Sequence, residues 1–216
     1  CEVCNHELAW YELIPLLSFI FQGGKCRKCH TKISWWYPAV ELITGLFYLF
    51  SFLYFGFTYD FLICLVIASL VVIISISDFN YLIILDEPLI VGSLLVLFLN
   101  YLKNNFMGFG TSLLSGILLF LFFLFIKLIG DAVFKRESLG GGDIKLCFFI
   151  GAVLGYRLSF ISIVIGSFLA LPVALFYLIK EKEREIPFGP FLIIATWIVF
   201  LFSSYITEFI ELLFKL

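Results

Sequence analysis

Seven long apolar segments, separated by short polar stretches, dominate this chain of 216 residues. They cover residues 37–57, 61–77, 88–102, 111–129, 144–156, 158–179 and 188–207. A helix that crosses the hydrocarbon core of a bilayer needs about 20 apolar residues, within a range of about 17–25. Most of the segments reach that length, although 88–102 and 144–156 are short. The sequence therefore predicts an all-α, multi-pass membrane protein with seven transmembrane segments.

The composition supports this fold class. Hydrophobic residues make up 62% of the chain and charged residues 14%, whereas soluble domains have about 45–50% and about 25%. The net charge is −2, and the basic residues form short clusters between apolar segments, so nucleic-acid binding is not expected. The chain begins with Cys1 and not with Met, so we expect an N-terminal piece to precede it.

The positive charges divide unequally between alternate loops. Nine lie on one side and three on the other: Lys25, Arg27, Lys28, Lys32, Lys135, Arg136, Lys180, Lys182 and Arg184 against Lys103, Arg157 and Lys215. Lys and Arg are retained on the cytoplasmic side of a membrane. The count predicts that residues 1–36 and the loops 78–87, 131–143 and 180–187 face the cytosol.

Two aspartates lie at that cytosolic face. Asp78 ends an apolar run, and Asp143 opens a helix directly after the glycine run 140–142. Carboxylates beside hydrocarbon are costly, and function is the usual reason to keep them. Three glycines permit a positive φ and the close approach of a substrate strand. If the two carboxyls come close they share a proton, so one can act as a general base while the other polarises a scissile carbonyl.

A plainer interpretation of the same residues is that Asp143 caps a helix and Asp78 marks the edge of the membrane. Asp86 is a rival to Asp78, but it stands beside Glu87 and Pro88, where we expect more solvent. Lys145 either stabilises the carboxylate pair or reaches lipid head groups.

Four cysteines precede the first apolar segment as two CxxC pairs: Cys1, Cys4, Cys26 and Cys29. Two such pairs at this spacing are typical of a structural tetrathiolate zinc site, and a cytosolic location favours metal over disulfides. The alternatives are two disulfides or free thiols, and His6 and His30 are substitute ligands. We predict a zinc-binding domain over residues 1–36 and a membrane domain over residues 37–216.

Several motifs together resemble the bacterial type IV prepilin peptidases, which are GxGD intramembrane aspartyl proteases. They are ELIPLLS at 12–18, GKCRKC at 24–29, YPAVEL at 37–42, GGGDIKL at 140–146 and IPFGPF at 186–191. The matches follow one another in the family's order over nearly the whole chain. Two departures are Glu2-Val3, where the first CxxC usually holds a proline, and Leu85, where the loop usually holds a proline.

The resemblance implies that Asp78 and Asp143 are the catalytic pair, with support from Gly140, Gly142 and Lys145. It implies cleavage of the short basic leader of type IV prepilins, of type II secretion pseudopilins or of competence pilins, at the cytoplasmic face of the bacterial inner membrane. It also implies an eighth span before Cys1, and methylation of the new N-terminus with S-adenosylmethionine. The sequence has no Rossmann-type glycine fingerprint, so no residue is assigned to that cofactor.

Two other functions fit parts of the pattern. A transporter or channel would use the carboxylates to bind a cation, although both lie at one membrane face and not near the midplane. A non-catalytic assembly scaffold built on the zinc domain would tolerate loss of both carboxylates.

Overall fold

The computed structural model describes residues 1, 3–135, 137–180 and 186–214. Every regular element in these ranges is helical, and the only strand-type pairing there is an isolated bridge between Lys25 and Lys32. Five residues of the charge and motif arguments lie outside the described residues: Glu2, Arg136, Lys182, Arg184 and Lys215. The chain forms two compact units, Cys1–Phe50 and Ser51–Leu216.

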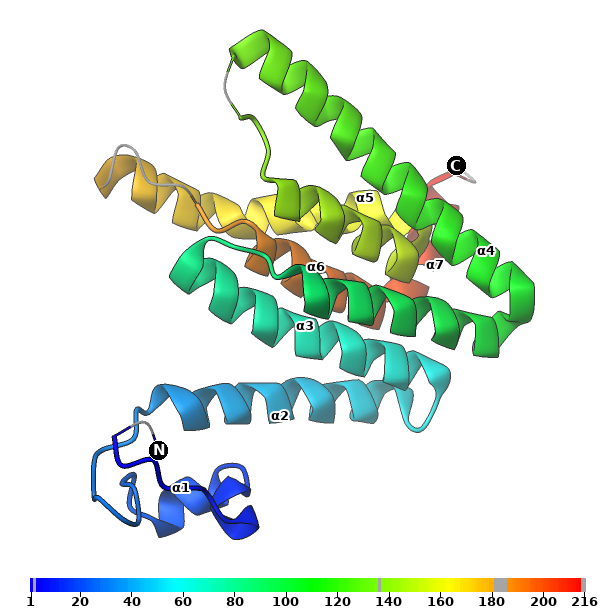
Figure 1. The fold of residues 1–216 in the computed structure, drawn as a ribbon. Helices are drawn as coiled ribbons and strands as arrows, with labels where there is room; N and C mark the ends of the chain where they lie inside the picture. Colours follow the sequence, from blue (N-terminus) through cyan, green and yellow to red (C-terminus); the bar gives the residue numbers. More distant parts are fainter. Residues whose placement is uncertain (2, 136, 181–185, 215–216) are drawn as a thin grey trace. The chain divides into compact units, whose positions relative to one another are not determined.

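The first unit contains the short helices η1 (Trp10–Leu13) and α1 (Leu17–Phe21) and most of α2 (Trp36–Phe55) (Figure 1). Its small core is built on Phe19, whose ring packs edge-on against Trp35 with 4.8 Å between centroids. Gly24 has a φ of +68°, and a Cβ there would lie 3.0 Å from the Phe19 ring. Glu41 of α2 accepts a 2.8 Å hydrogen bond from the Leu16 amide and so ties the helix to this unit.

The second unit is a helical bundle of α3 (Tyr59–Tyr81), α4 (Asp86–Phe134), α5 (Gly141–Lys180), α6 (Gly189–Leu201) and α7 (Ser203–Phe214). Figure 1 shows that α4 and α5 each fold back on themselves. The α4 backbone leaves the helical conformation at Asn104 and Asn105, and the α5 backbone does so at Gly155, where φ is 70°. Each of these two elements therefore provides two helical arms.

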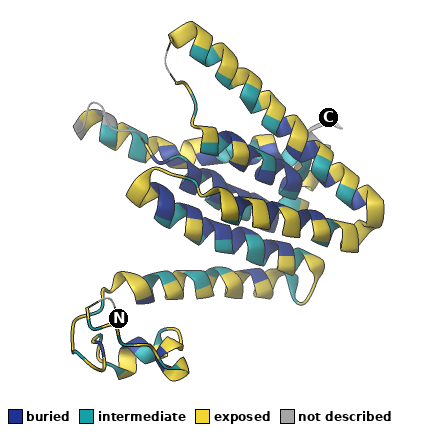
Figure 2. Ribbon diagram, viewed as in Figure 1, coloured by how far each residue is buried: buried dark blue, intermediate teal, exposed yellow. Residues whose placement is uncertain are grey.

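Close helix packing forms the core of the bundle. α5 packs against α4 and α6, and α3 packs against α6 and α4. A Cβ on Gly151 of α5 would lie 2.6 Å from the Ser115 carbonyl oxygen of α4, so only glycine permits this approach. The Ser112 hydroxyl donates to the Ala152 carbonyl at the same crossing. Figure 2 shows that the buried residues of this bundle lie where its helices face one another, and many of its exposed residues are large and apolar.

Four of the described helices are long and apolar enough to cross a membrane: α2, α3, α4 and α5. α6 and α7 would make a fifth span if counted together, although they are bent by 75°. The prediction of an all-helical membrane protein is thus confirmed at this level. The predicted segments 88–102 and 111–129 lie on the two arms of α4, and 144–156 and 158–179 lie largely on the two arms of α5.

Candidate active site and metal centre

Asp78 lies in the last turn of α3, and it is the more deeply buried of the two candidate catalytic residues, with 6% exposure. The helix ends when Leu82 adopts a left-handed conformation, with φ of 55°, and its amide bonds the Asp78 carbonyl oxygen. The Asp78 carboxylate accepts a 3.1 Å hydrogen bond from the Gly189 amide, at the first residue of α6. Asp78 is thus near the negative end of its own helix and at the positive end of another.

Asp143 lies in the first turn of α5, where amide donors and the helix dipole favour an anion. The preceding glycine run permits a positive φ, but none of Gly140, Gly141 and Gly142, all within the described residues, has one. The need for glycine is steric. A Cβ on Gly142 would lie 2.9 Å from the Ile84 Cβ, and a Cβ on Gly140 would lie 3.1 Å from the Asp143 Oδ2.

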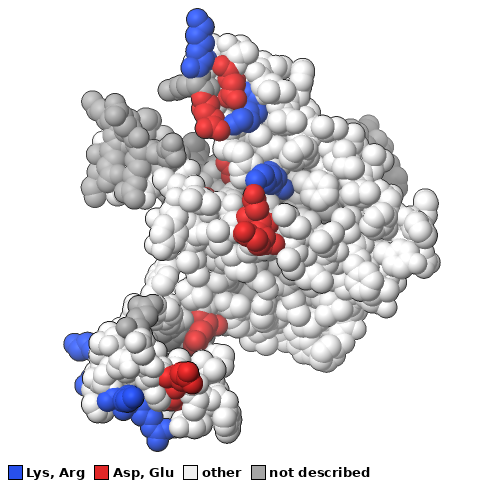
Figure 3. Space-filling view, viewed as in Figure 1, with Lys and Arg blue, Asp and Glu red and all other residues white. Residues whose placement is uncertain are grey.

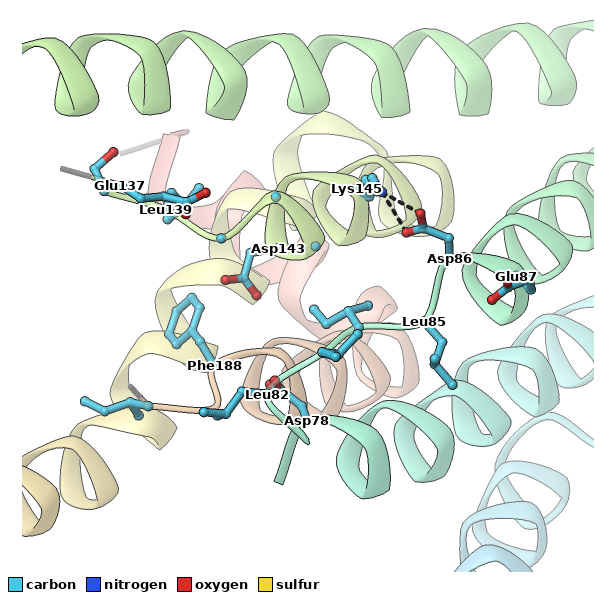
Figure 4. Close-up of a pocket in the computed structure, with 17 residues that line it drawn as sticks. Asp78, Leu82, Leu85, Asp86, Glu87, Glu137, Leu139, Asp143, Lys145 and Phe188 are labelled. Carbon is cyan, nitrogen blue, oxygen red and sulfur yellow. Dashed lines mark hydrogen bonds and ion pairs between the residues drawn. The ribbon is translucent and has the colours of Figure 1, made fainter. Parts of the chain in front are cut away.

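A cavity of about 760 Å³ brings the two aspartates together. Figure 4 shows both carboxyls pointing into the same space, with the Phe188 ring to one side. No hydrogen bond joins these two described side chains directly. The lining comes from the end of α3, the start of α4 and the loop before it, the start of α5 and the loop before it, and the residues that precede α6: Asp78, Leu82, Ile83, Ile84, Leu85, Asp86, Glu87, Glu137, Ser138, Leu139, Gly140, Gly141, Gly142, Asp143, Lys145, Ile186 and Phe188.

Lys145 and Asp86 form an ion pair at the edge of this cavity. The Lys145 ammonium contacts both carboxylate oxygens of Asp86, at 2.7 Å and 2.6 Å, and both side chains are half exposed (Figure 4). The structure therefore gives Lys145 a partner other than Asp78 or Asp143. The cavity as a whole is lined by five carboxylates and one lysine.

One contact of the site was absent from the sequence argument. Residues 186–191 entered that argument only as one of the family motifs, with no contact to Asp78 expected, whereas Gly189 donates to Asp78 and packs against it. A Cβ on Gly189 would lie 3.1 Å from the Asp78 Oδ2 and 2.9 Å from the Ile84 Cδ1. A glycine beside a proline at a helix start was the available signal.

Charged side chains of the second unit are sparse on the face drawn in Figure 3, and they gather near the cavity. The Lys145–Asp86 pair lines the cavity, and a second pair, Lys127–Glu137, contributes Glu137 to the lining. The Lys103–Asp60 pair joins the beginning of α3 to the middle of α4, so it lies at the opposite end of α3 from Asp78.

The four cysteines of the first unit form a cluster that could hold a metal ion. Their sulfur atoms all lie within 4.8 Å of one another. The Sγ–Sγ distance is 3.8 Å for Cys1 and Cys29 and 3.9 Å for Cys4 and Cys26. A tetrahedral ion with bonds of about 2.3 Å needs sulfur atoms about 3.8 Å apart, so the donor set fits zinc geometry.

The surroundings of the cluster favour a thiolate at Cys29 and disfavour one at Cys4, whose pKa is raised, above all by burial. The Thr31 hydroxyl lies 3.2 Å from the Cys29 sulfur, and the hydrogen bonds from Thr31 lower the pKa of Cys29 to about 6. The His6 ring has a different partner, because its Nε2 is 3.3 Å from the Glu12 carboxylate. That contact and, above all, a 2.9 Å bond from the Ala9 amide lower the pKa of Glu12.

Fold and site together define an all-helical membrane protein with a four-cysteine unit and two carboxyls that face one cavity. Residues 65–175 match the type IV leader peptidase family, and residues 1–55 match the bacterial peptidase A24 N-terminal domain. The chain belongs to the type IV leader peptidase family.

Several curated relatives carry the name prepilin leader peptidase/N-methyltransferase. The relative from Bacillus subtilis (strain 168) is 32% identical, and the match covers 97% of this chain and 83% of that protein. The relative from Pseudomonas aeruginosa is 31% identical, and the match covers 96% of this chain and 72% of that protein. The relative from Myxococcus xanthus (strain DK1622) is 38% identical, and the match covers 73% of this chain and 47% of that protein. No solved structure gives a significant match.

Proposed function

We propose that this protein is an aspartic endopeptidase that removes the leader from type IV prepilins or pseudopilins. Family membership supports the reaction class. The observation that carries the assignment of the site is the geometry of Asp78 and Asp143, which come from different helices and line one cavity. A cavity of about 760 Å³ is within the range of about 300–1,000 Å³ that is usual for ligand sites.

In the proposed mechanism the two carboxyls share one proton. The ionised carboxylate takes a proton from water, and the water oxygen attacks the scissile carbonyl carbon. The protonated carboxyl donates its proton to the carbonyl oxygen as the tetrahedral intermediate forms. When the C–N bond breaks, the carboxyl that received the proton from water gives it to the leaving amine, and the other carboxylate takes a proton from one of the two hydroxyls of the intermediate as the new carboxylic acid forms, which restores the shared proton.

Gly140 and Gly142 support this chemistry in the proposal by leaving space around Asp143 and Ile84. Lys145 supports it indirectly, because its ion pair with Asp86 joins the start of α5 to the start of α4. Both elements contribute to the wall of the cavity.

We further propose that residues 1–36 form a zinc-binding domain, with the ion held by Cys1, Cys4, Cys26 and Cys29, and that residues 37–216 form the catalytic domain. Zinc would act structurally, because four thiolates leave no open coordination position. The sulfur distances near 3.8 Å support this ion.

We also propose seven spans in this chain, with the active site and the cysteine unit facing the cytosol at the inner membrane. The breaks at Asn104–Asn105 and at Gly155 support two spans each for α4 and α5. The nine-to-three distribution of positive charge supports the orientation.

Incubation of the purified protein in detergent with a prepilin and S-adenosylmethionine tests the function, with the product weighed by mass spectrometry. Loss of the leader mass reports cleavage, and one added methyl group on the new N-terminal amine reports the methyltransferase activity named in the relatives. An unchanged prepilin mass would refute the peptidase. Cation flux in liposomes that needs both aspartates would instead favour a transporter.

A further inference from the structure

The segment that leads into Asp143 is fastened to the end of α4. This segment, residues 137–140, lines the cavity and precedes the start of α5 at Gly141. Figure 4 shows Glu137 and Leu139 on it, beside Asp143. Glycines at 140–142 leave the backbone there with more conformational freedom than any other residue would. Their geometry therefore depends on what holds the residues before them.

Lys127 of α4 holds two of these residues. Its ammonium donates to the Leu139 carbonyl oxygen at 2.5 Å and to the Glu137 carboxylate at 2.6 Å. The Lys127 side chain is only 17% exposed, although Glu137 is 73% exposed. The lysine is thus folded back over the segment and does not extend into solvent.

Asp131, one turn further along α4, holds Ser138, the residue between Glu137 and Leu139. Its Oδ1 accepts hydrogen bonds from the Ser138 amide at 2.7 Å and from the Ser138 hydroxyl at 2.8 Å. Gly130 leaves the space for this contact, because a Cβ there would lie 2.5 Å from the Ser138 Oγ. Asp131 and Lys127 also lie 3.9 Å apart as an i, i+4 ion pair.

Lys127 follows a long apolar run, because the ten preceding residues, 117–126, are all apolar. An ammonium at the end of such a run loses hydration, so it is retained where a specific partner replaces water. Here the partners are a carbonyl and a carboxylate of the segment that carries Asp143.

We propose that Lys127 and Asp131 are positioning residues that fix residues 137–139 and thereby set the place of Asp143 in the cavity. The proposal rests on the proposed peptidase function. It predicts that loss of the Lys127 contacts lowers kcat more than it raises KM, since the chemical step depends on the alignment of Asp143. A misplacement of about 1 Å at a catalytic group costs about 10²-fold in rate.

The test compares Lys127→Met with Lys127→Arg and with the control Lys103→Met. Lys103 also carries one carboxylate partner, Asp60 at 2.6 Å, but it is remote from the cavity. For Lys127→Met we expect kcat for prepilin cleavage to fall about tenfold or more, KM to change by less than about threefold, and the thermal midpoint to stay near that of Lys103→Met. Arginine should restore much of kcat, because it can still donate to both acceptors.

Hydrogen–deuterium exchange of residues 137–143 provides a readout that does not need activity. Exchange there should be faster in Lys127→Met and unchanged in Lys103→Met. Should Lys127→Met fail to fold, Ser138→Ala removes the hydroxyl contact to Asp131 and should give a smaller change of the same kind. Wild-type kcat together with wild-type exchange would overturn the proposal, as would an equal loss of activity in Lys103→Met. A wild-type protein that cleaves no prepilin would overturn the peptidase function, and the exchange experiment alone would then decide whether Lys127 and Asp131 fix residues 137–139.

Discussion

The glycine run before Asp143 allows a sharp comparison of two neighbouring positions. Gly141→Ala and Gly142→Ala make the same chemical change one residue apart. A Cβ at position 141 would meet nothing within 4 Å, whereas a Cβ at position 142 would lie 2.9 Å from the Ile84 Cβ and 3.3 Å from its Cγ1. Neither glycine has a positive φ, so backbone strain does not enter the comparison.

The size of the effect follows from that contact. Carbon atoms pack best at about 3.5–4.0 Å, so the new methyl group at position 142 is more than about 0.5 Å too close. The Ile84 Cβ is bonded to the backbone and cannot rotate away, so the loop before α4 or the start of α5 must shift. Overpacking of this kind costs about 1–3 kcal/mol. If the shift appears wholly as misalignment of Asp143, kcat falls about fivefold to 150-fold.

Gly141→Ala should behave in the opposite way. Position 141 begins α5 and is exposed to open space. Alanine is favoured over glycine in helices by up to about 1 kcal/mol. We therefore expect kcat near the wild-type value and a thermal midpoint that is equal or slightly higher.

The assay is the initial rate of prepilin cleavage by the purified variants in detergent, followed at several substrate concentrations, with thermal unfolding measured on the same samples. Equal activity of the two variants, or a greater loss in Gly141→Ala, would refute the steric argument. It would mean that the 140–142 run is needed for flexibility and not for space beside Ile84.

Three further predictions concern the catalytic pair, the metal and the pair at the cavity edge. Asp78→Asn and Asp143→Asn should each abolish leader removal while the protein still inserts into membranes, and detectable cleavage by either variant would remove it from the catalytic pair. Asp86→Asn should retain cleavage, because its half-exposed ion pair is worth at most about 1 kcal/mol; an inactive variant would make Asp86 the better candidate. Cys26→Ser should lower the bound zinc, measured by elemental analysis, from one ion per chain towards none. Cys64→Ser, which changes a buried cysteine of α3 outside the four-cysteine cluster, should keep it. Equal metal content in the two cysteine variants would place any zinc elsewhere.

The helical membrane fold could be predicted from the sequence, because the length of an apolar segment can be read from consecutive residues alone. It also anticipated two of the breaks, at Asn104–Asn105 and near Gly155, where polar residues or glycine interrupt the apolar runs. The bend of 75° between α6 and α7 was missed. Residues 198–202 are uniformly apolar there, so no local signal separates a straight span from a broken one.

Inside the candidate site, too, local sequence signals reveal some features and miss others. Asp78 and Asp143 stand out in the sequence because charge beside hydrocarbon is costly. Their partners do not stand out, since the Gly189 amide is 111 residues from Asp78, and the Lys145–Asp86 pair spans 59 residues. The sequence signal for this backbone donor is indirect, because a glycine beside a proline marks the start of a helix but does not indicate which side chain its amide will contact. Such contacts follow from how the helices meet and not from the composition of either one.

The donor to Asp78 also explains how a buried carboxyl is tolerated at that place. Asp78 is in the last turn of α3, where the helix dipole and the free carbonyls disfavour a negative charge. The first amide of α6 supplies a hydrogen bond and an opposing dipole. α6 can come this close only because residue 189 has no side chain, since a Cβ would lie 3.1 Å from the carboxylate oxygen. Asp78 can therefore carry charge only if α6 lies this close to it, and α6 can lie this close only if residue 189 is glycine.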